Sequence, residues 1–346
     1  KKAGINLIDK KTVDIWCDRT KSCNTQLTKM WKQNINIIPK WILYPIIILN
    51  NIIPGGKLHK IPKTKSDDKD ILNLATSICK EPNIRFTEEE EVRGQEGLLK
   101  LGIDINAKYV CLTVRDSAYL EKQKRESRSG VDWSYHDYRN SEIDDYKLAA
   151  LELVKLGYYV IRMGVVAEKS FSCGTDKVID YAFKGLRTDF MDIYLGAKCE
   201  FCITTATGYD AIPSLFRKPL LVVNYTHIEY FQTNPKTITI FKIIRDMNSN
   251  YLSIKTILDK GIGRFGRTNQ FRDAGVELIA NKPEEIRDAA IEMVLRLEDK
   301  WDDSWYDVEV KDKVACFFSN SKLNGDILSR YGTQFLKDNL YLLDDN

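Results

Sequence analysis

From about Lys108 onward, short apolar segments alternate with amphipathic ones, and this alternation most constrains how the chain can fold. Strands are expected at 109–114, 158–163, 200–204, 220–224, 238–243 and 276–280. Helices are expected between and after them at 145–155, 188–195, 209–216, 254–259 and 283–297. Buried strands that alternate with helices predict an α/β fold, with a parallel sheet covered on both faces. Ligands bind such sheets at the carboxyl ends of the strands, so a site is expected there.

The chain has 346 residues, enough for two domains, and its 43% hydrophobic content allows each domain a buried core. The charge is unevenly distributed. Residues 1–65 hold thirteen basic and three acidic side chains, a net +10, whereas the remainder carries a net −7. A basic end beside an acidic body predicts an anionic partner for the N-terminal part. No nucleic-acid partner is expected.

Residues 24–53 predict two helices separated by Pro39. The second contains the intensely apolar run 41–49, which is about half of the roughly 20 residues needed to cross a bilayer. Two interpretations stay open. The run is either a core helix of an N-terminal domain, or a surface that rests on an anionic membrane, with the lysines of residues 29–65 on lipid phosphates.

The eight cysteines are scattered, and most lie inside apolar runs where a thiol behaves as a small hydrophobe. Cys199 and Cys202 have C-x-x-C spacing, but the surrounding pattern is that of a strand and no second pair has metal-site spacing. The sequence therefore favours no metal or redox site. It indicates a reduced, cytoplasmic location, with peripheral attachment to the inner face of the membrane under the second interpretation of 41–49.

The strand at 200–204 ends in a turn of small and hydroxyl-bearing residues that leads directly into a helix. The residues concerned are Thr204, Thr205, Thr207, Gly208 and Asp210. Small side chains let a diphosphate approach backbone N–H groups at the start of a helix, and an acidic side chain there can accept hydrogen bonds from ribose hydroxyls. The alternative is a threonine-rich cap on an ordinary strand-to-helix connection.

Arg115, followed by Asp116 and Ser117, ends the strand at 109–114. A guanidinium at this place faces the ligand crevice, where its planar fork suits a diphosphate. The alternative is a structural Arg–Asp pair. Two further strand-to-loop transitions carry weaker signals of the same kind, at Arg162, Gly164, Arg187 and Asp189.

The stretch 133–141 gathers aromatic, imidazole, carboxylate and guanidinium groups without helical periodicity. Such loops often perform recognition and acid–base chemistry. The residues of interest are His136, Asp137, Arg139 and Asn140. Asn140 or Ser141 could also simply cap the following helix. His59, in the basic N-terminal part, is a further candidate base.

Taken in order, these segments resemble a known family. The strand ending in Val-Arg-Asp-Ser is followed by YHDYRNS, IRMG, RTDFMDIYLGA, ITTATGYDAIP and RKPLLVVNY. This order is similar to that of bacterial glycosyltransferases of the GT-B type associated with surface-polysaccharide biosynthesis. The likeness covers most of residues 24–245 and extends distantly to fucosyltransferases and UDP-GlcNAc 2-epimerases.

The resemblance implies two Rossmann-like domains that face a cleft. Residues 1–105 would be a basic acceptor-side domain, residues 106–300 the nucleotide-sugar-binding domain, and residues 301–346 a helical tail packing back on the N-terminal domain. By position, Arg115, Thr205, Thr207 and Gly208 would hold phosphates and Asp210 the ribose. No cofactor or metal is implied. The sequence departs from the family pattern before Lys11, where the first strand and glycine loop of an acceptor domain are not evident.

The sequence thus predicts a metal-independent glycosyltransferase that moves a sugar from a nucleotide-activated donor to a glycan or lipid-linked acceptor. Arg115, Arg139 and the N–H groups of Thr207 and Gly208 would stabilise the leaving diphosphate. His136 and Asp137 are the candidate bases in the crevice loop. The alternatives are a nucleotide-sugar epimerase of the same fold and a non-catalytic glycan- or lipid-binding protein.

Overall fold

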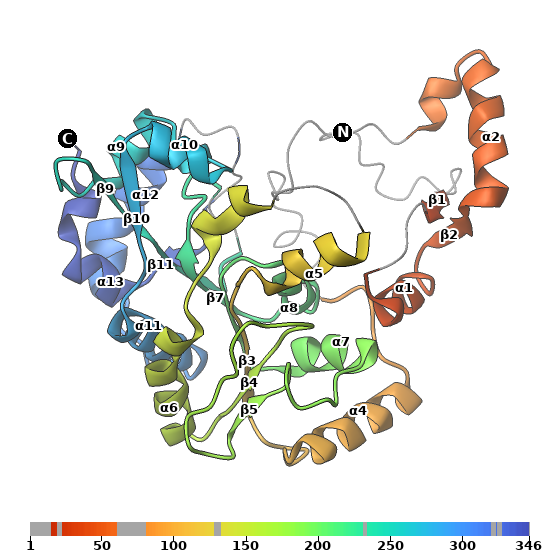
Figure 1. The fold of residues 1–346 in the computed structure, drawn as a ribbon, viewed down its shortest axis with the longest axis horizontal. Coiled ribbons are helices and arrows are strands. Elements are labelled where there is room, and N and C mark those ends of the chain that lie inside the picture. Colours follow the sequence, from red (N-terminus) through yellow and green to blue (C-terminus); the bar gives the residue numbers. More distant parts are fainter. Residues whose placement is uncertain are drawn as a thin grey trace.

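The computed structural model describes residues 15–18, 23–60, 81–127, 133–230, 234–319, 323 and 327–345. At its centre lies a seven-stranded sheet, all of whose pairings are parallel, in the order β11-β8-β7-β6-β3-β4-β5 (Figure 1). The strands are β3 (Tyr109–Thr113), β4 (Tyr159–Arg162), β5 (Val178–Asp180), β6 (Cys202–Thr204), β7 (Leu220–Tyr225), β8 (Thr237–Phe241) and β11 (Arg330–Tyr331). The predicted parallel α/β fold is confirmed.

The strand order reverses at β3, which is the first strand of this sheet along the chain. The chain proceeds through β4 and β5 on one side, then returns to add β6, β7, β8 and β11 on the other. This is the Rossmann order 3-2-1-4-5-6 with one strand added at the edge. The switch point lies between β3 and β6, where Thr113 is paired with Thr204. A ligand crevice is therefore expected beyond these two residues.

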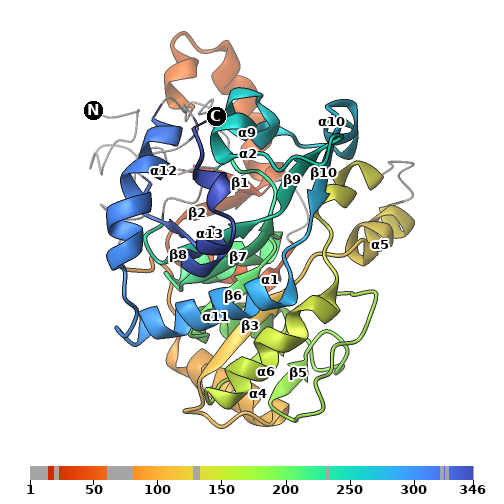
Figure 2. The same cartoon turned by 90° about the vertical axis from the view of Figure 1, so that its left-hand side faces the viewer.

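Helices cover both faces of the sheet. Figures 1 and 2 show α6 (Lys147–Lys155) and α11 (Pro283–Leu297) on one face, and α4 (Glu88–Leu101) and α7 (Asp189–Lys198) on the other. Val110, Ile161 and Leu221 in the strands between are fully buried. Each such side chain contributes about 1.5–3 kcal/mol relative to exposure. The strands are mostly apolar because both faces of the sheet are covered.

The shorter helices of this part connect the strands to the main helices. They are α5 (Ala118–Ser127), η2 (Ser134–Arg139), η3 (Ile143–Tyr146), η4 (Gly208–Asp210), α8 (Ala211–Leu215), α9 (Ile254–Asp259), η5 (Ile262–Arg264) and α10 (Thr268–Asp273). The stretch 134–139, expected as an irregular loop, is thus about two turns of 3-10 helix.

Helix α4 fits tightly against α7. It begins at a capping box in which Thr87 and Glu90 satisfy each other's backbone N–H groups. Gly94 allows the close approach, since a Cβ atom there would lie 2.1 Å from the Tyr194 ring. Lys198 pairs with Glu91 at 2.6 Å across the same contact. This helix of the predicted segment 1–105 therefore packs on the sheet, and the domain boundary at 105 stays a prediction.

The N-terminal elements differ in part from expectation. Helix α1 (Thr25–Trp31) ends before the isoleucines that were expected to extend it. Residues 36–39 instead form β2 (Asn36–Pro39), which pairs in parallel with β1 (Ile15–Asp18). The β-branched side chains and Pro39 disfavour a helix at this place, and pairing with β1 decides for a strand. Helix α2 (Lys40–Ile52) and the 3-10 turn η1 (Gly56–His59) follow and project from the body (Figure 1).

One expected strand lies outside the main sheet. The segment 238–243 divides into β8 and β9 (Ile243–Asp246), and β10 (Val276–Ile279) pairs antiparallel with β9. Their register joins Ile244 to Leu278. This two-stranded ribbon leads into α11, whose Pro283 takes the first helical position, where proline is well tolerated.

The C-terminal elements contact the segment 106–300. The sequence predicted instead that they would pack on the N-terminal domain. They are η6 (Tyr306–Val310, a π-helix), α12 (Lys311–Phe318), α13 (Thr333–Asp338) and η7 (Leu340–Leu343). Buried Glu292 of α11 accepts the N–H of Thr333 at 2.7 Å, which ties α13 to α11. Throughout the described ranges, no helix has both the length and the apolar character that crossing a membrane requires.

Candidate functional site

The ends of β3 and β6 are tied together at the switch point. The N–H of Thr205 donates to the carbonyl oxygen of Thr113 at 3.3 Å. The N–H of Arg115 in turn donates to Thr205 Oγ1 at 2.9 Å. One step further out, the hydroxyls of Thr113 and Thr207 lie 3.3 Å apart. The predicted donor turn and the predicted arginine are therefore neighbours, held by hydrogen bonds across the crevice.

The threonines of the turn after β6 differ in burial, and only the outer one is accessible. Thr204 and Thr205 are 0% and 3% exposed, so their hydroxyls serve the fold and not a ligand. Thr204 Oγ1 accepts the N–H of Thr207 at 3.4 Å. Ala206 has φ +57°, a left-handed conformation in which a non-glycine residue is strained. The Thr205 hydroxyl, expected to contact phosphate, is therefore less accessible than the outer part of the turn.

That outer part of the turn begins with the half-buried Thr207. Its hydroxyl accepts the N–H of Tyr209 at 3.3 Å and so caps η4. Gly208 is exposed, and a Cβ atom placed on it would meet nothing within 4 Å. Asp210 is half-buried at the start of α8. The open face at Gly208 leaves room for a ligand to approach the main chain.

Two arginines contact this turn, Arg115 through its backbone N–H and Arg139 through its side chain. Arg139 Nη2 donates to the carbonyl oxygen of Ala206. Arg115 Nε is buried without a hydrogen-bond partner among the described residues, and neither arginine forms an ion pair with any of them. Burial, and next the charge of Arg139, lower the pKa of Arg115. Two cations held together in this way form a site for an anion.

His136 lies in the field of the same cations. Burial lowers its pKa below the ordinary 6.5, and the charges of Arg115, Arg139 and Arg267 lower it further. Its ring lies 4.0 Å from the Tyr135 ring, centroid to centroid, and 6.2 Å from Trp133. The imidazole is therefore neutral at pH 7 and able to accept a proton.

A buried lysine that the sequence analysis missed holds η2 in place. Lys242, 7% exposed, donates to the carbonyl oxygens of Tyr138 at 3.0 Å and Asn140 at 2.7 Å. Burial lowers its pKa to about 8. The Tyr138 hydroxyl is also 2.8 Å from His227 Nε2. Lys242 directly follows the buried strand β8, so the criterion that selected Arg115 would have selected it too.

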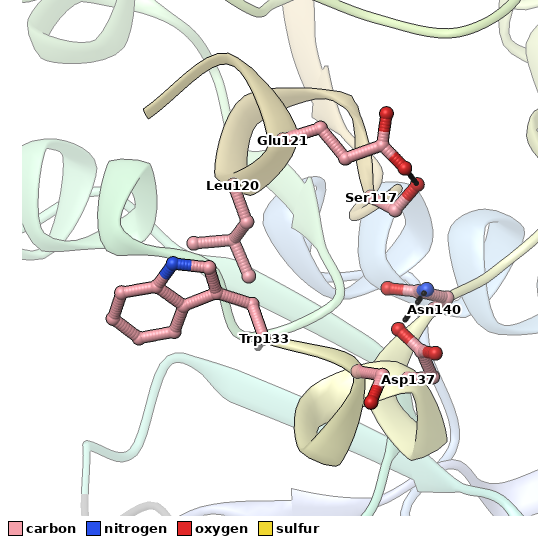
Figure 3. Close-up of a pocket in the computed structure, with 7 residues that line it drawn as sticks. Ser117, Leu120, Glu121, Trp133, Asp137 and Asn140 are labelled. Atoms are coloured by element: carbon pink, nitrogen blue, oxygen red, sulfur yellow. Dashed lines mark hydrogen bonds between the residues drawn. The ribbon is translucent and has the colours of Figure 1, made fainter. Parts of the chain in front are cut away.

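A pocket of about 240 Å³ opens between α5 and η2 (Figure 3). It is lined by Ser117, Leu120, Glu121, Trp133, Ser134, Asp137 and Asn140. Figure 3 shows the Trp133 indole beside Leu120, with the Glu121 carboxylate and the Asp137–Asn140 pair on the polar side. No feature of the sequence singled out Leu120 and Glu121, because the segment that forms α5 has the charged composition of an ordinary surface helix. Carboxylates and an amide beside an indole suit a ligand that carries hydroxyls on a compact ring.

Arg162 ends β4, as predicted, but its side chain is engaged in ion pairs. It is 2% exposed and pairs with Asp180 at 3.1 Å and Asp116 at 3.8 Å. Asp116 also accepts the N–H of Glu168 at 3.0 Å, and the Ser117 hydroxyl donates to the Glu168 carboxylate. The structural Arg–Asp pair that was an alternative for Arg115 therefore exists at Arg162. Its buried carboxylate partners leave Arg162 unsuited to bind phosphate.

Arg187 and Asp189 are likewise engaged away from the switch point. Arg187 pairs with Asp192 at 2.6 Å and with Asp189 at 3.4 Å. Asp189 Oδ2 accepts both the N–H and the hydroxyl of Thr25, at 2.9 and 2.8 Å. These residues anchor α1 to the start of α7. Gly164 follows β4, with Ala182 Cβ 3.4 Å from where its own Cβ would be.

The remaining candidates lie elsewhere. His59 is on η1, where its Nδ1 is 2.6 Å from Asn50 Oδ1, and Figure 1 shows this segment apart from the sheet. Cys199 and Cys202 are buried free thiols, and Cys199 Sγ donates to the Gly196 carbonyl at 3.3 Å. Within the part of the chain that is described, no three His, Cys, Asp or Glu side chains gather as metal ligands would.

No protein-family model, curated protein or solved structure significantly matches this chain. The resemblance to glycosyltransferases therefore stays a prediction from the motifs. What the structure shows is a Rossmann-like α/β fold in which Arg115 and Arg139 hydrogen-bond to the turn after β6, at the switch point.

Proposed function

We propose that this protein is a glycosyltransferase that uses a nucleotide-activated sugar as donor. The observation that carries the proposal is the pair Arg115 and Arg139, which both hydrogen-bond to the turn at the β3–β6 switch point and form no ion pair with a described residue. A switch point of a Rossmann-order sheet is the usual nucleotide site. The sugar-transfer part of the proposal rests on the motif resemblance.

In this account the diphosphate of the donor lies between the two guanidinium groups and the turn at Thr207 and Gly208. Breaking the glycosidic bond leaves negative charge on that diphosphate. The Arg139 guanidinium is held by the Ala206 carbonyl and the backbone of Arg115 by Thr205, so both arginines would stabilise the charge as it develops with little reorganisation. The guanidinium pair supplies the charge that a divalent metal supplies in other transferases, so none is required.

The pocket between α5 and η2 would hold a sugar ring. Its carboxylates, from Glu121 and Asp137, accept hydrogen bonds from hydroxyls, and Trp133 offers an apolar face. The acceptor hydroxyl must lose a proton. Asp137, exposed at the pocket, and His136, neutral at pH 7, are the two bases at hand. Residues 1–105 as an acceptor-side domain of a GT-B arrangement belong to this proposal.

The test begins with thermal unfolding in the presence of UDP, GDP, CMP and CDP. A ligand that binds only the folded state raises the melting temperature. We expect a nucleoside diphosphate to raise it in the wild type and not in Arg115→Gln. Arg272→Gln, an exposed cation on α10, serves as the matched control and should respond like the wild type. No shift with any of the four nucleotides would contradict the proposal.

The second step separates transfer from epimerisation. The sugar donor of the base that binds is incubated with and without glycan acceptors, and the released nucleotide is measured. Release that depends on the acceptor supports transfer. A changed sugar with no nucleotide released would make the protein an epimerase. Asp137→Asn and His136→Gln should lower turnover at saturating donor if either supplies the base.

A further inference from the structure

Helix α2 and the turn η1 form a projecting hairpin, residues 40–59, to which the proposed function gives no residue of the donor site or the sugar pocket (Figure 1). Helix α2 is apolar on nearly every side, yet Leu43 is its one buried residue within the described structure. Trp41 is 77% exposed, Ile52 76% and Leu58 of η1 89%. Tyr44, Ile46, Ile48, Leu49 and Ile53 are also exposed. An apolar patch of this kind on a folded protein marks a docking surface.

The hairpin is built as a defined unit. Asn50 Nδ2 donates to the carbonyl oxygen of Gly56 at 2.7 Å, which closes η1 onto the end of α2. Gly55 has φ +80°, and a Cβ atom on Gly56 would lie 1.9 Å from the Asn50 carbonyl oxygen. Both glycines are therefore needed for the turn. The exposed side chains are displayed by regular structure.

The charge around the hairpin identifies what it docks against. No acidic residue occurs between Asp18 and Asp67. Lys40, Lys57 and Lys60 flank the apolar residues, and none forms an ion pair with a described residue. A protein partner of ordinary composition would not require an apolar surface ringed only by cations. An anionic bilayer presents both an apolar interior and negative headgroups.

We propose that the α2–η1 hairpin inserts into the headgroup region of an anionic phospholipid bilayer. The 13 residues of α2 span about 20 Å as a helix, less than the roughly 30 Å of a hydrocarbon core, so the hairpin enters one leaflet and does not cross. Trp41 and Tyr44 suit the interface, where one side of a ring is apolar and the other wet. The inference is independent of the proposed transferase activity. It would also bring the sheet close to a lipid-linked acceptor.

The experiment is flotation of the full chain with vesicles of phosphatidylcholine alone or of equal parts phosphatidylcholine and phosphatidylglycerol. We expect binding to the anionic vesicles that weakens with salt. Leu49→Glu/Ile52→Glu should lower this binding at least about tenfold, because two inserted apolar side chains are lost. Replacing Lys40, Lys57 and Lys60 by Gln should lower it by about fivefold for each lysine.

The matched control is Met247→Glu/Val308→Glu, which places two charges at positions 83% and 77% exposed on other elements. It should bind like the wild type, and all variants should melt as the wild type does. Absence of wild-type binding, or equal binding by the α2 variant, would overturn the proposal. So would a dimer in gel filtration that Leu49→Glu/Ile52→Glu dissociates, since the hairpin would then contact a second copy. Nucleotide-induced melting shifts, measured without vesicles, test the proposed transferase by itself. Failure of that proposal can therefore be distinguished from failure of the membrane proposal.

Discussion

Thr205 Oγ1 accepts the backbone N–H of Arg115 at 2.9 Å, and this bond fixes where the arginine leaves the sheet. Thr205 is on the turn after β6 and Arg115 is at the end of β3, so the bond crosses the switch point of the fold. The side chain of Thr205 is buried and that of Arg115 only partly so. A buried hydroxyl thus positions a cation that faces the crevice.

Replacing Thr205 by Val should cost about 1–3 kcal/mol of unfolding free energy, because the Arg115 N–H loses its partner in a buried place. Thr239→Val is the matched control, since Thr239 Oγ1 is buried with no partner among the described residues. That substitution should be neutral or stabilising. Chemical denaturation of both variants measures the difference. Equal losses of unfolding free energy in Thr205→Val and Thr239→Val would mean that the hydrogen bond from Arg115 to Thr205 does not contribute to stability.

Arg162→Met should destabilise the fold by about 3–5 kcal/mol, because it leaves the Asp180 carboxylate without its cation. The double variant Arg162→Met/Asp180→Asn should recover part of that loss. If Arg162 is structural, as its ion pairs indicate, the double variant also keeps its melting shift with nucleotide. Loss of that melting shift in a well-folded double variant would mean that Arg162 takes part in nucleotide binding.

His136 should titrate below the ordinary pKa of 6.5 in the free protein, because burial and three arginines disfavour its charged form. Its contribution to stability is then complete above pH 6.5 and is lost as the pH falls through its folded pKa. A bound diphosphate offsets the arginine charges and should raise that pKa. Imidazole NMR signals measure both values, with His59 and His227 as internal references. An unchanged His136 pKa in the complex would contradict a diphosphate at the arginines.

Gly208→Ala should leave stability within about 0.5 kcal/mol, because a Cβ atom there meets nothing within 4 Å. It should nevertheless weaken nucleoside diphosphate binding, since the methyl group occupies the open side of the turn. Gly266→Ala, also in open space, is the control and should bind like the wild type. Titration calorimetry gives both affinities. Equal affinities would place the phosphates away from Gly208.

The periodicity of the sequence predicted five of the seven strands of the main sheet and missed the short edge strands β5 and β11. Wholly apolar runs such as Tyr109–Thr113 can only be strands buried on both faces, and the helix Ile254–Asp259 has the bounds that were expected. It was insufficient at 35–38, where helical spacing of isoleucines competed with β-branching and Pro39, and pairing with β1 decided the outcome. Tertiary pairing of this kind leaves no local signal.

The site, like the fold, could be predicted from the sequence only in part. An arginine or a threonine after a buried strand identifies the edge of the sheet, and Arg115 and Thr207 lie there. The same rule also selected Arg162, because the sequence does not show that Asp180 and Asp116 lie beside it. Glu121 was missed for the opposite reason. Its place at the pocket depends on how α5 packs over η2, which no residue pattern specifies.

The most direct test of the central claim is the affinity of a nucleoside diphosphate for the wild type, Arg115→Gln and Arg272→Gln, measured by titration calorimetry. The account predicts that Arg115→Gln weakens binding by about 10- to 100-fold, the value of one or two hydrogen bonds to a charged group. Arg272→Gln, on the exposed surface of α10, should bind as the wild type does. Equal binding by Arg115→Gln and the wild type would contradict a diphosphate site at the β3–β6 switch point.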